Sequence, residues 1–279
     1  MLKETLGMSE RLACKAVGLA RSTYRRLPIA QTPADPDADL RAWLRRCAIN
    51  YPCHGFRRAW AALRHDEHRA VYKKKVHRLW RAEGLQAPVH SPRKRAGISS
   101  APRVHADAPK VVWAIDFQFD STIDGKAVNI ASMIDEHTRV SLLHLVERSV
   151  TAHRLVIELE EVFATHGTPM VLRMDNGPEL ISQALQRFCD GKVGLYYIPP
   201  GAPRDNGYIE SFNNRLRKEC LKCLNRNHWT NLREARVVIG DYKHDHNHRH
   251  RHSALGYRIP AEYAAACRHT HHPVTWSIN

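Results

Sequence analysis

Long apolar stretches and an export signal are both missing from this sequence. No run approaches the roughly 18–20 apolar residues that span a bilayer. The N-terminal MLKETLGMSERLACKAVG lacks the long apolar centre of a signal peptide. These absences argue against a membrane partner and predict the cytoplasm as the compartment. The seven cysteines have scattered spacings, so we expect reduced thiols that mostly fill cores.

Two other absences narrow the class of activity. A Gly-x-Ser-x-Gly segment does not occur, so a metal-free hydrolase with a Ser-His-Asp triad is poorly supported. Acidic residues are scarce in the first 110 positions, where 9 Asp and Glu stand against 23 Lys and Arg; the remainder holds 19 against 20. Nearly all of the net charge of +15 therefore belongs to the N-terminal part. Such charge favours a polyanionic partner, with nucleic acid preferred over an anionic membrane surface.

The N-terminal part shows helical patterns and linkers. Segment 1–30, with Ser9 as a helix cap and a turn at Gly18, is a candidate helix-turn-helix. After a proline-rich linker, segment 37–90 is predicted to be a helical domain whose basic residues contact DNA. Its expected helices are 37–50, 51–66 and 69–85. Segment 91–110 is rich in Pro, Ser and basic residues and predicts an interdomain linker.

From residue 111 the pattern changes to α/β. The expected strands are 111–120, 127–140, 141–149, 169–177 and 193–200. The expected helices are 151–167, 181–191, one within 202–220, and one from about 230 to beyond 244. Three leading strands followed by βαβ units predict a mixed sheet flanked by helices.

Three acidic residues stand where strands and a following helix would converge. Asp116 interrupts the apolar strand VVWAIDF, Asp175 ends MVLRMDNG, and Glu210 lies in the first turns of the next helix. In α/β sheets such positions meet at one crevice, and gathered carboxylates repel one another unless a cation neutralises them. Mg²⁺ binds carboxylate, water and phosphate oxygens. Two such ions can hold both the attacking and the leaving oxygen of a phosphoryl transfer.

Each acid also has a structural interpretation. Asp175 can form a turn within Asp-Asn-Gly, and Glu210 can be a helix-start residue favoured by the helix dipole. Asp116 is harder to explain in this way, because an acid within an apolar strand is costly unless it is paired or metal-bound. Asp120 shares its face of the strand, and we interpret it as a surface or turn acid. The acids at 135–136 are interpreted as a hairpin turn.

Five segments together resemble one family. VWAIDF, RMDNGPEL and PPGAPRDNGYIESFNNRLRKEC resemble the acid-bearing segments of the DDE transposases of bacterial insertion sequences. The resemblance is to the branch related to retroviral integrases, the second-frame product of the IS-three family. Arg217 stands seven positions after Glu210, where that family has a basic residue. Residues 246–264 resemble its C-terminal signature, and 51–85 its upstream helix-turn-helix segment.

The resemblance implies a fold and a chemistry. The fold would be a ribonuclease-H-like core at 111–265, with a mixed five-stranded sheet and flanking helices, followed by a tail at 266–279. Asp116, Asp175 and Glu210 would be catalytic and would hold two Mg²⁺ or Mn²⁺ ions. A water would attack the phosphodiester at the element's end, and the freed 3′-hydroxyl would then attack target DNA.

The implied partners are double-stranded DNA, as terminal inverted repeats and as target, further copies of the chain, and the upstream reading-frame product, all at the nucleoid. The resemblance and the basic charge together predict DNA contacts in three regions. The helix that carries Glu210, the helix-turn-helix-like segment and the linker contribute Asn213, Asn214, Arg217, Lys218, Arg57, Arg58, Lys73, Lys74, Lys75, Arg78, Arg93, Lys94 and Arg95.

The sequence departs from the family pattern in three ways. The spacing between Asp175 and Glu210, with 34 intervening residues, is one shorter than usual. The signature has 250–252 as His-Arg-His where the family often has Arg-Pro-His, and no heptad run is present. Two rival functions stay open: a nuclease of the same fold that cuts without joining, and a non-catalytic DNA-binding regulator. The presence of all three acids argues against the regulator.

Cysteine and histidine groups leave additional metal binding open. Cys220 and Cys223, followed by His228, have part of a zinc-ligand pattern. The alternating histidines between 244 and 252 could bind a metal, or close a helix and contact DNA or solvent.

Overall fold

The computed structural model describes residues 7–25, 35–86, 105–177, 179–199, 206–221 and 226–271. The chain divides into two compact units, Met1–Cys47 and Ala48–Asn279. No helix in the described ranges is both long and apolar enough to cross a membrane.

The first unit contains short helices. They are α2 (Glu10–Ala16), α3 (Arg21–Tyr24) and most of α4 (Ala38–Asn50). Ser9 occupies the N-cap position of α2, but its side chain makes no cap hydrogen bond. Gly18 has a φ of 66°, a backbone conformation that glycine adopts without steric cost, and it permits the turn between α2 and α3.

The second unit begins with two amphipathic helices. They are α5 (Phe56–His65) and α6 (Lys73–Ala82). α6 buries Val76, Leu79 and Trp80 on one face, as the apolar periodicity predicts. Both helices are shorter than expected from the sequence, because residues 51–55 contain a turn, residues 69–72 are not helical, and α6 ends at Ala82.

A five-stranded mixed sheet is the centre of the second unit. Its strands are β1 (Val112–Ser121), β2 (Ala127–Asp135), β3 (Ser141–Glu147), β4 (Val171–Met174) and β5 (Gly194–Tyr197). The order is β3-β2-β1-β4-β5. β1 pairs antiparallel with β2 and parallel with β4, and β4 pairs parallel with β5. The predicted mixed sheet is confirmed.

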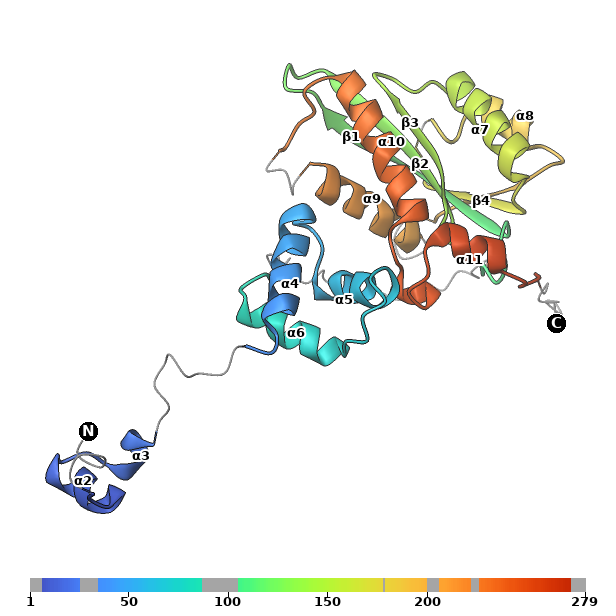
Figure 1. Cartoon of the computed structure of the whole chain (residues 1–279). Helices are drawn as coiled ribbons and strands as arrows, with labels where there is room; N and C mark the ends of the chain where they lie inside the picture. The colour runs from blue at the N-terminus through green and yellow to red at the C-terminus, as the bar shows by residue number, and fades with distance from the viewer. Residues whose placement is uncertain are drawn as a thin grey trace. The chain divides into compact units, whose positions relative to one another are not determined.

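Helices cover both faces of this sheet (Figure 1). One face carries α7 (Ala152–His166) and α8 (Gln183–Cys189), and the other carries α9 (Gly207–Cys220) and α10 (Leu232–His248). α7 stops at Gly167, which has a φ of 81°, as its position predicts. The chain continues through a 3-10 turn, Ser253–Leu255, into α11 (Pro260–Ala266).

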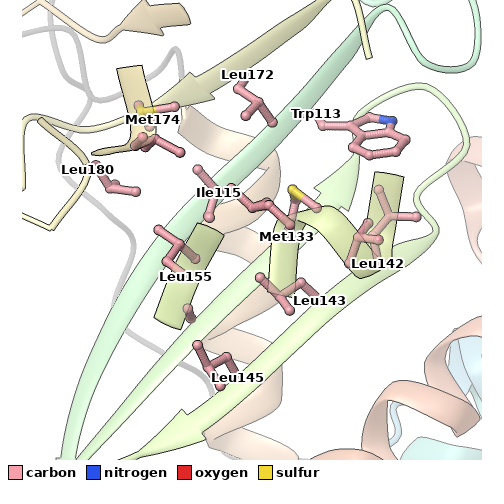
Figure 2. Close-up of a cluster of buried hydrophobic side chains, with 14 of the residues drawn as sticks. Trp113, Ile115, Met133, Leu142, Leu143, Leu145, Leu155, Leu172, Met174 and Leu180 are labelled. Atoms are coloured by element: carbon pink, nitrogen blue, oxygen red, sulfur yellow. The ribbon is translucent and has the colours of Figure 1, made fainter. Parts of the chain in front are cut away.

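Strand alternation divides β1 between the two faces. Trp113 and Ile115 belong to the core under α7 and α8, which Figure 2 shows together with Met133 and Leu172. Ala114 belongs instead to the core under α9 and α10. Because successive side chains alternate, even-numbered residues of β1 point toward α9.

The predicted hairpin turn at 135–136 is present, and both of its acids are buried. Asp135 ends β2, and the Arg139 N–H donates to the Asp135 carbonyl in the turn that leads to the antiparallel strand β3. Asp135 is buried, and its carboxylate accepts hydrogen bonds from the Trp113 indole and from the backbone N–H of Lys110, His137 and Thr138. Glu136 is also buried and accepts two bonds from the guanidinium of Arg173, at 2.7 and 2.8 Å. Both acids are paired inside the fold, as buried carboxylates must be.

The expectation of reduced cysteines holds for five residues and fails for one. Cys14, Cys47, Cys189, Cys220 and Cys267 are free. Cys53 is disulfide-bonded. Burial raises the pKa of the Cys220 thiol to about 12, so this cysteine behaves as core filler. Cys223 lies outside the described residues, so of the zinc group that the sequence left open only Cys220 and His228 are described.

Candidate active site

Asp116 lies on the face of β1 that meets α9. It stands opposite Ser132 of β2. The side-chain amide of Asn213, on α9, donates to Asp116 Oδ2 at 2.9 Å, and the Phe117 backbone N–H donates to Oδ1 at 3.0 Å. Asn213 is itself buried, and its backbone carbonyl accepts a bond from the side chain of Gln118. One strand and one helix thus fix the first acid.

The register of the parallel strands aligns Asp175 with Asp116. Val112, Trp113 and Ala114 pair with Val171, Leu172 and Arg173. The same offset, extended along both strands, brings position 116 level with position 175. Adjacent strands lie about 4.8 Å apart, so the two carboxylates approach each other at the end of β4.

The turn after β4 holds Asp175 at that edge. The Gly177 N–H donates to Asp175 Oδ1 at 3.1 Å, so Asp175 forms the predicted turn and also stands beside Asp116. A Cβ at Gly177 would lie 3.2 Å from Asp175 Oδ1 and 3.4 Å from Glu179 Oε2. Glu179 is therefore a further carboxylate close to this turn, which sequence reasoning did not single out.

Glu210 lies in the first turn of α9, and its charge acts on Asp116. The pKa of Asp116 rises from 3.8 to about 6. Burial is the main cause, and the charge of Asp175 is the next; the Asn213 and Phe117 hydrogen bonds oppose the rise, and the charge of Glu210 adds to it. Asp175 and Glu210 are thus both within electrostatic reach of Asp116.

This group of carboxylates fits a divalent cation. Asp116 is half-buried beside two other acids, which is costly for an ionised carboxylate without a counter-ion. Asp175 is exposed, so the group remains open to water and to a substrate. Hard cations such as Mg²⁺ bind carboxylate oxygens together with water and phosphate oxygens. Asp116, Asp175 and Glu210 are the residues that would hold such an ion.

A second polar contact between β1 and α9 lies four residues further along each element than the Asp116–Asn213 contact. Arg217 donates to Asp120 Oδ1 at 2.7 Å. The Asp120 side chain is only 5% exposed, whereas that of Arg217 is 49% exposed. Asp120 is therefore not the surface or turn acid that the sequence suggested. Burial raises the pKa of Asp120, and the Arg217 charge opposes that rise.

The predicted DNA contacts on α9 have different surroundings. Asn214 and Arg217 are exposed, Lys218 is half-buried, and Asn213 is buried against Asp116. Of the two asparagines offered for DNA, Asn214 is thus the one that faces solvent.

The predicted contacts outside α9 also differ in exposure. Lys74, Lys75 and Arg78 are exposed along α6, and Arg57 is exposed on α5. Two others bind within the protein: Arg58 pairs with Glu219 at 2.7 Å, and the Lys73 ammonium donates to the Tyr257 hydroxyl at 2.7 Å. Residues 93–95, the linker arginines and lysine, lie outside the described residues.

Most of the alternating histidines are internal. Burial lowers the pKa of His246 to about 4 and that of His250 to about 2. His246 bonds through Nε2 to the carbonyl of Arg139, and His250 packs edge-on against His54 of the segment before α5. The rings of His244 and His248 lie in a tilted contact, with centroids 4.7 Å apart, at the exposed side of α10. The C-terminal signature therefore joins the catalytic core to the helical segment that precedes it.

Known protein families match almost the whole described chain. Two models of the family described as "Integrase core domain" match residues 106–201 and 192–260, and one described as "HTH-like domain" matches residues 35–95. The three acids lie within the two integrase-core matches, and α5 and α6 lie within the third.

Individual proteins are also similar. Over 276 residues the chain is 35% identical to "Insertion element IS407 uncharacterized 31.7 kDa protein" from Burkholderia multivorans, which covers 96% of this chain and 95% of that protein. It is 30% identical over 264 residues to "Probable transposase for insertion sequence element IS1353" from Shigella flexneri, covering 89% of this chain and 50% of that one.

A solved structure shares the fold. In a cryo-EM structure of a simian T-cell lymphotropic virus intasome in complex with PP2A regulatory subunit B56 gamma, one chain matches with a TM-score of 0.53 at 16% identity, over 78% of each chain. At this identity the match concerns the fold alone, and it identifies the sheet and its helices as the ribonuclease-H-like integrase core predicted from the sequence.

Proposed function

Because this chain belongs to the DDE transposases of bacterial insertion sequences, the IS-three family, we propose that it cuts DNA at an element's ends and joins the freed 3′-hydroxyls to target DNA. In the first step a water oxygen bonds to phosphorus and the 3′-oxygen leaves with a proton. In the second step that 3′-hydroxyl bonds to a target phosphorus, and the target's own 3′-oxygen leaves. Each step forms one P–O bond and breaks one, so no external energy source is required.

The observation that carries this proposal is the gathering of Asp116, Asp175 and Glu210 at one edge of the sheet. We assign these three residues as the ligands of two Mg²⁺ or Mn²⁺ ions. When bound, such ions activate the nucleophile and stabilise the charge that develops at phosphorus. Asn213 supports this arrangement, since its amide N–H favours the charged form of Asp116 and orients the carboxylate.

The remaining parts of the chain have proposed roles in holding DNA. We assign 37–90 and segment 1–30 to DNA binding, 91–110 to a basic linker, and 111–265 to the catalytic core. The partners would be the terminal inverted repeats and target DNA, with further copies of the chain assembled on the two ends. The upstream reading-frame product is a further partner, and the cytoplasmic nucleoid is the place of action.

Strand transfer with a pre-cut DNA end, matching the element's terminal repeat, tests the proposal. Joining is compared in Mg²⁺, Mn²⁺ and EDTA, for the unmodified protein, for Glu210→Gln and for the control Glu160→Gln. Glu160 is an exposed acid on α7, away from α9. We expect joined products that require the metal, disappear with Glu210→Gln and persist with Glu160→Gln.

Other outcomes would lead to different conclusions. Joining that survives Glu210→Gln would exclude Glu210 from the site. Metal-dependent cutting without joining, even when the upstream product is added, would identify a nuclease instead. DNA binding without either reaction under the same conditions would identify a non-catalytic regulator.

A further inference from the structure

α9 has a second side, away from the acids, that lines a pocket. At about 100° per residue, Tyr208, Ser211 and Arg215 fall within about 60° of one another around the helix axis. Arg215 lies about 140° around the helix from Glu210. The three residues line a pocket of about 270 Å³. This pocket is therefore separate from the group of acids and lies across α9 from it.

Arginine side chains dominate the lining, and we call this cavity the arginine pocket. They come from four places along the second unit. α5, the turn between β2 and β3, α9 and the segment after α10 provide Arg57, Arg58, Arg139, Arg215 and Arg251. Five positive side chains around one cavity of this size repel one another unless negative charge is brought among them.

Only part of this charge is balanced within the protein. Arg58 pairs through Nη1 with Glu219 at 2.7 Å, and Arg251 pairs through Nε with Asp66 at 2.9 Å. Nη2 of Arg58 and Nη1 of Arg139 are buried and have no acceptor in the described part of the chain. A buried N–H of a charged group is costly when it lacks an acceptor. These two donors thus indicate that an acceptor from outside belongs in the pocket.

Burial and the positive charge of the pocket lower the pKa values of groups in its wall. Burial, and then the charge of Arg58, lowers the pKa of Arg215. Burial, His246, Arg215 and Arg58 together lower the pKa of His252 to about 2. Burial also lowers the pKa of His246, the other histidine in the wall, to about 4. Both histidines are therefore neutral near pH 7, and the positive charge of the pocket comes from its arginines.

The donors are held in fixed orientations. The guanidinium of Arg139 lies 3.5 Å from the centre of the Tyr208 ring, and such stacking restrains the planar fork. Arg139 and Tyr257, another lining residue, both have a φ of 63°, which is unfavourable for residues other than glycine. Hydroxyl groups of Ser211 and Ser253 lie at the exposed rim. Arginine forks with nearby hydroxyls suit the oxygens of a phosphate group.

We propose that the arginine pocket binds a phosphate group of the DNA backbone, at a point separate from the phosphodiester that is cut. The inference rests on the proposed function in one respect, that DNA is the partner. A phosphate held there would attach DNA to the back of the helix that carries Glu210. Binding of DNA would then help to set the position of α9, and so of that acid, relative to β1.

The test measures DNA binding in EDTA, where no chemistry occurs. Affinity for a terminal-repeat duplex is measured across salt concentrations for Arg139→Gln, Arg215→Gln and the double variant. Arg187→Gln, which removes an exposed arginine on α8, is the control for lost charge. Each pocket variant should weaken binding roughly tenfold. Each should also reduce the slope of log affinity against log salt by about 0.9, the value for one phosphate.

The double variant should reduce the slope no further than either single variant, because both arginines contact the same phosphate. Arg139→Lys, which keeps the charge but loses the fork, should preserve most of the slope and still lose affinity. Thermal unfolding of each variant shows whether it is folded before its slope is interpreted. Slopes equal to that of Arg187→Gln in folded variants would overturn the proposal.

A second measurement distinguishes DNA from a free ligand. Inorganic phosphate should raise the unfolding temperature of the unmodified protein, should do so less in Arg139→Gln, and should compete with the duplex. Stabilisation by phosphate with unchanged DNA affinity in the variants would mean that a free phosphate compound occupies the pocket, which overturns the proposal. An unmodified protein that joins no DNA, together with the expected loss of slope in the pocket variants, would refute the transposase proposal alone.

Discussion

The ionised carboxylate of Asp116 should destabilise the metal-free protein at neutral pH. Its pKa in the folded protein is about 6, against an ordinary value of 3.8. Since one pKa unit corresponds to about 1.4 kcal/mol, the ionised carboxylate lowers the free energy of unfolding by about 3 kcal/mol at pH 8. The main cause is burial, followed by repulsion from Asp175. Both causes are removed when the side chain is neutral.

The sign of the pH dependence follows from the raised pKa. The folded protein holds its proton more tightly than the unfolded chain, so the contribution of Asp116 to stability is greatest below about pH 4. That contribution is lost as the pH rises through about 6. At pH 5 the cost should be about half of its value at pH 8.

Asp116→Asn should therefore stabilise the protein in EDTA. The amide keeps the shape of the carboxylate and can still accept the Asn213 N–H. We expect the free energy of unfolding in urea to be about 2–3 kcal/mol higher for the variant than for the unmodified protein at pH 8. At pH 5 the increase should be about half as large. Asp241→Asn, on the exposed side of α10, is the matched control and should change stability by less than about 0.5 kcal/mol.

Metal should make the unmodified protein more stable than Asp116→Asn, the reverse of their order in EDTA. Mg²⁺ or Mn²⁺ in excess should stabilise the unmodified protein, since a ligand that binds only the folded state raises its stability, and should stabilise Asp116→Asn much less. A variant that is less stable than the unmodified protein in EDTA at pH 8, or that gains as much from metal, would refute the claim that Asp116 is held in a site built around a cation.

Further substitutions test the surroundings of the acids. Asn213→Leu removes a hydrogen bond that lowers the pKa of Asp116, so the pH midpoint of Mn²⁺-dependent joining should rise by about one unit; Asn214→Leu should leave it unchanged in the same pH series. Gly177→Ala places a methyl group 3.2 Å from Asp175 Oδ1, and we expect joining rates to fall about tenfold with little change in urea unfolding. Glu136→Gln removes the charge that pairs with the buried Arg173 guanidinium and should cost roughly 3–5 kcal/mol in urea unfolding; a change below 1 kcal/mol would show that this pair is not needed.

The sheet could be predicted from local patterns, and the partners of its acids could not. Apolar alternation is a property of adjacent residues, so the five strands were found within a few positions of their ends. The register that aligns Asp116 with Asp175 depends on the pairing of β1 with β4, which are far apart in the chain. The three acids could be grouped from the sequence only because strand ends in α/β folds meet at a shared edge.

The burial of Asp120 and of the acids at 135–136 was not predicted, for one physical reason. Asp120 was interpreted as a surface or turn acid, because charged residues near strand ends usually face water, and the turn at 135–136 gave no local sign that its acids are buried. The stabilising groups are distant in sequence: Arg217 pairs with Asp120, and Arg173 pairs with Glu136. A buried charge needs such a partner, and nothing within the local segment reveals it.

The roles of the two sides of α9 could be predicted only in part from the sequence. Helical geometry alone separates Arg215 from Arg217 by about 160° around the axis, so the two arginines cannot contact DNA on one stripe of the helix. Of these two arginines, only Arg217 was predicted from the sequence to contact DNA, since the family pattern marks that position. In the structure Arg217 binds Asp120 beside the acids, whereas Arg215 lines a pocket with other arginines. The angle between them was available from the sequence, but the chemistry on each side depends on β1 in one direction and on α5 and residues 251–257 in the other.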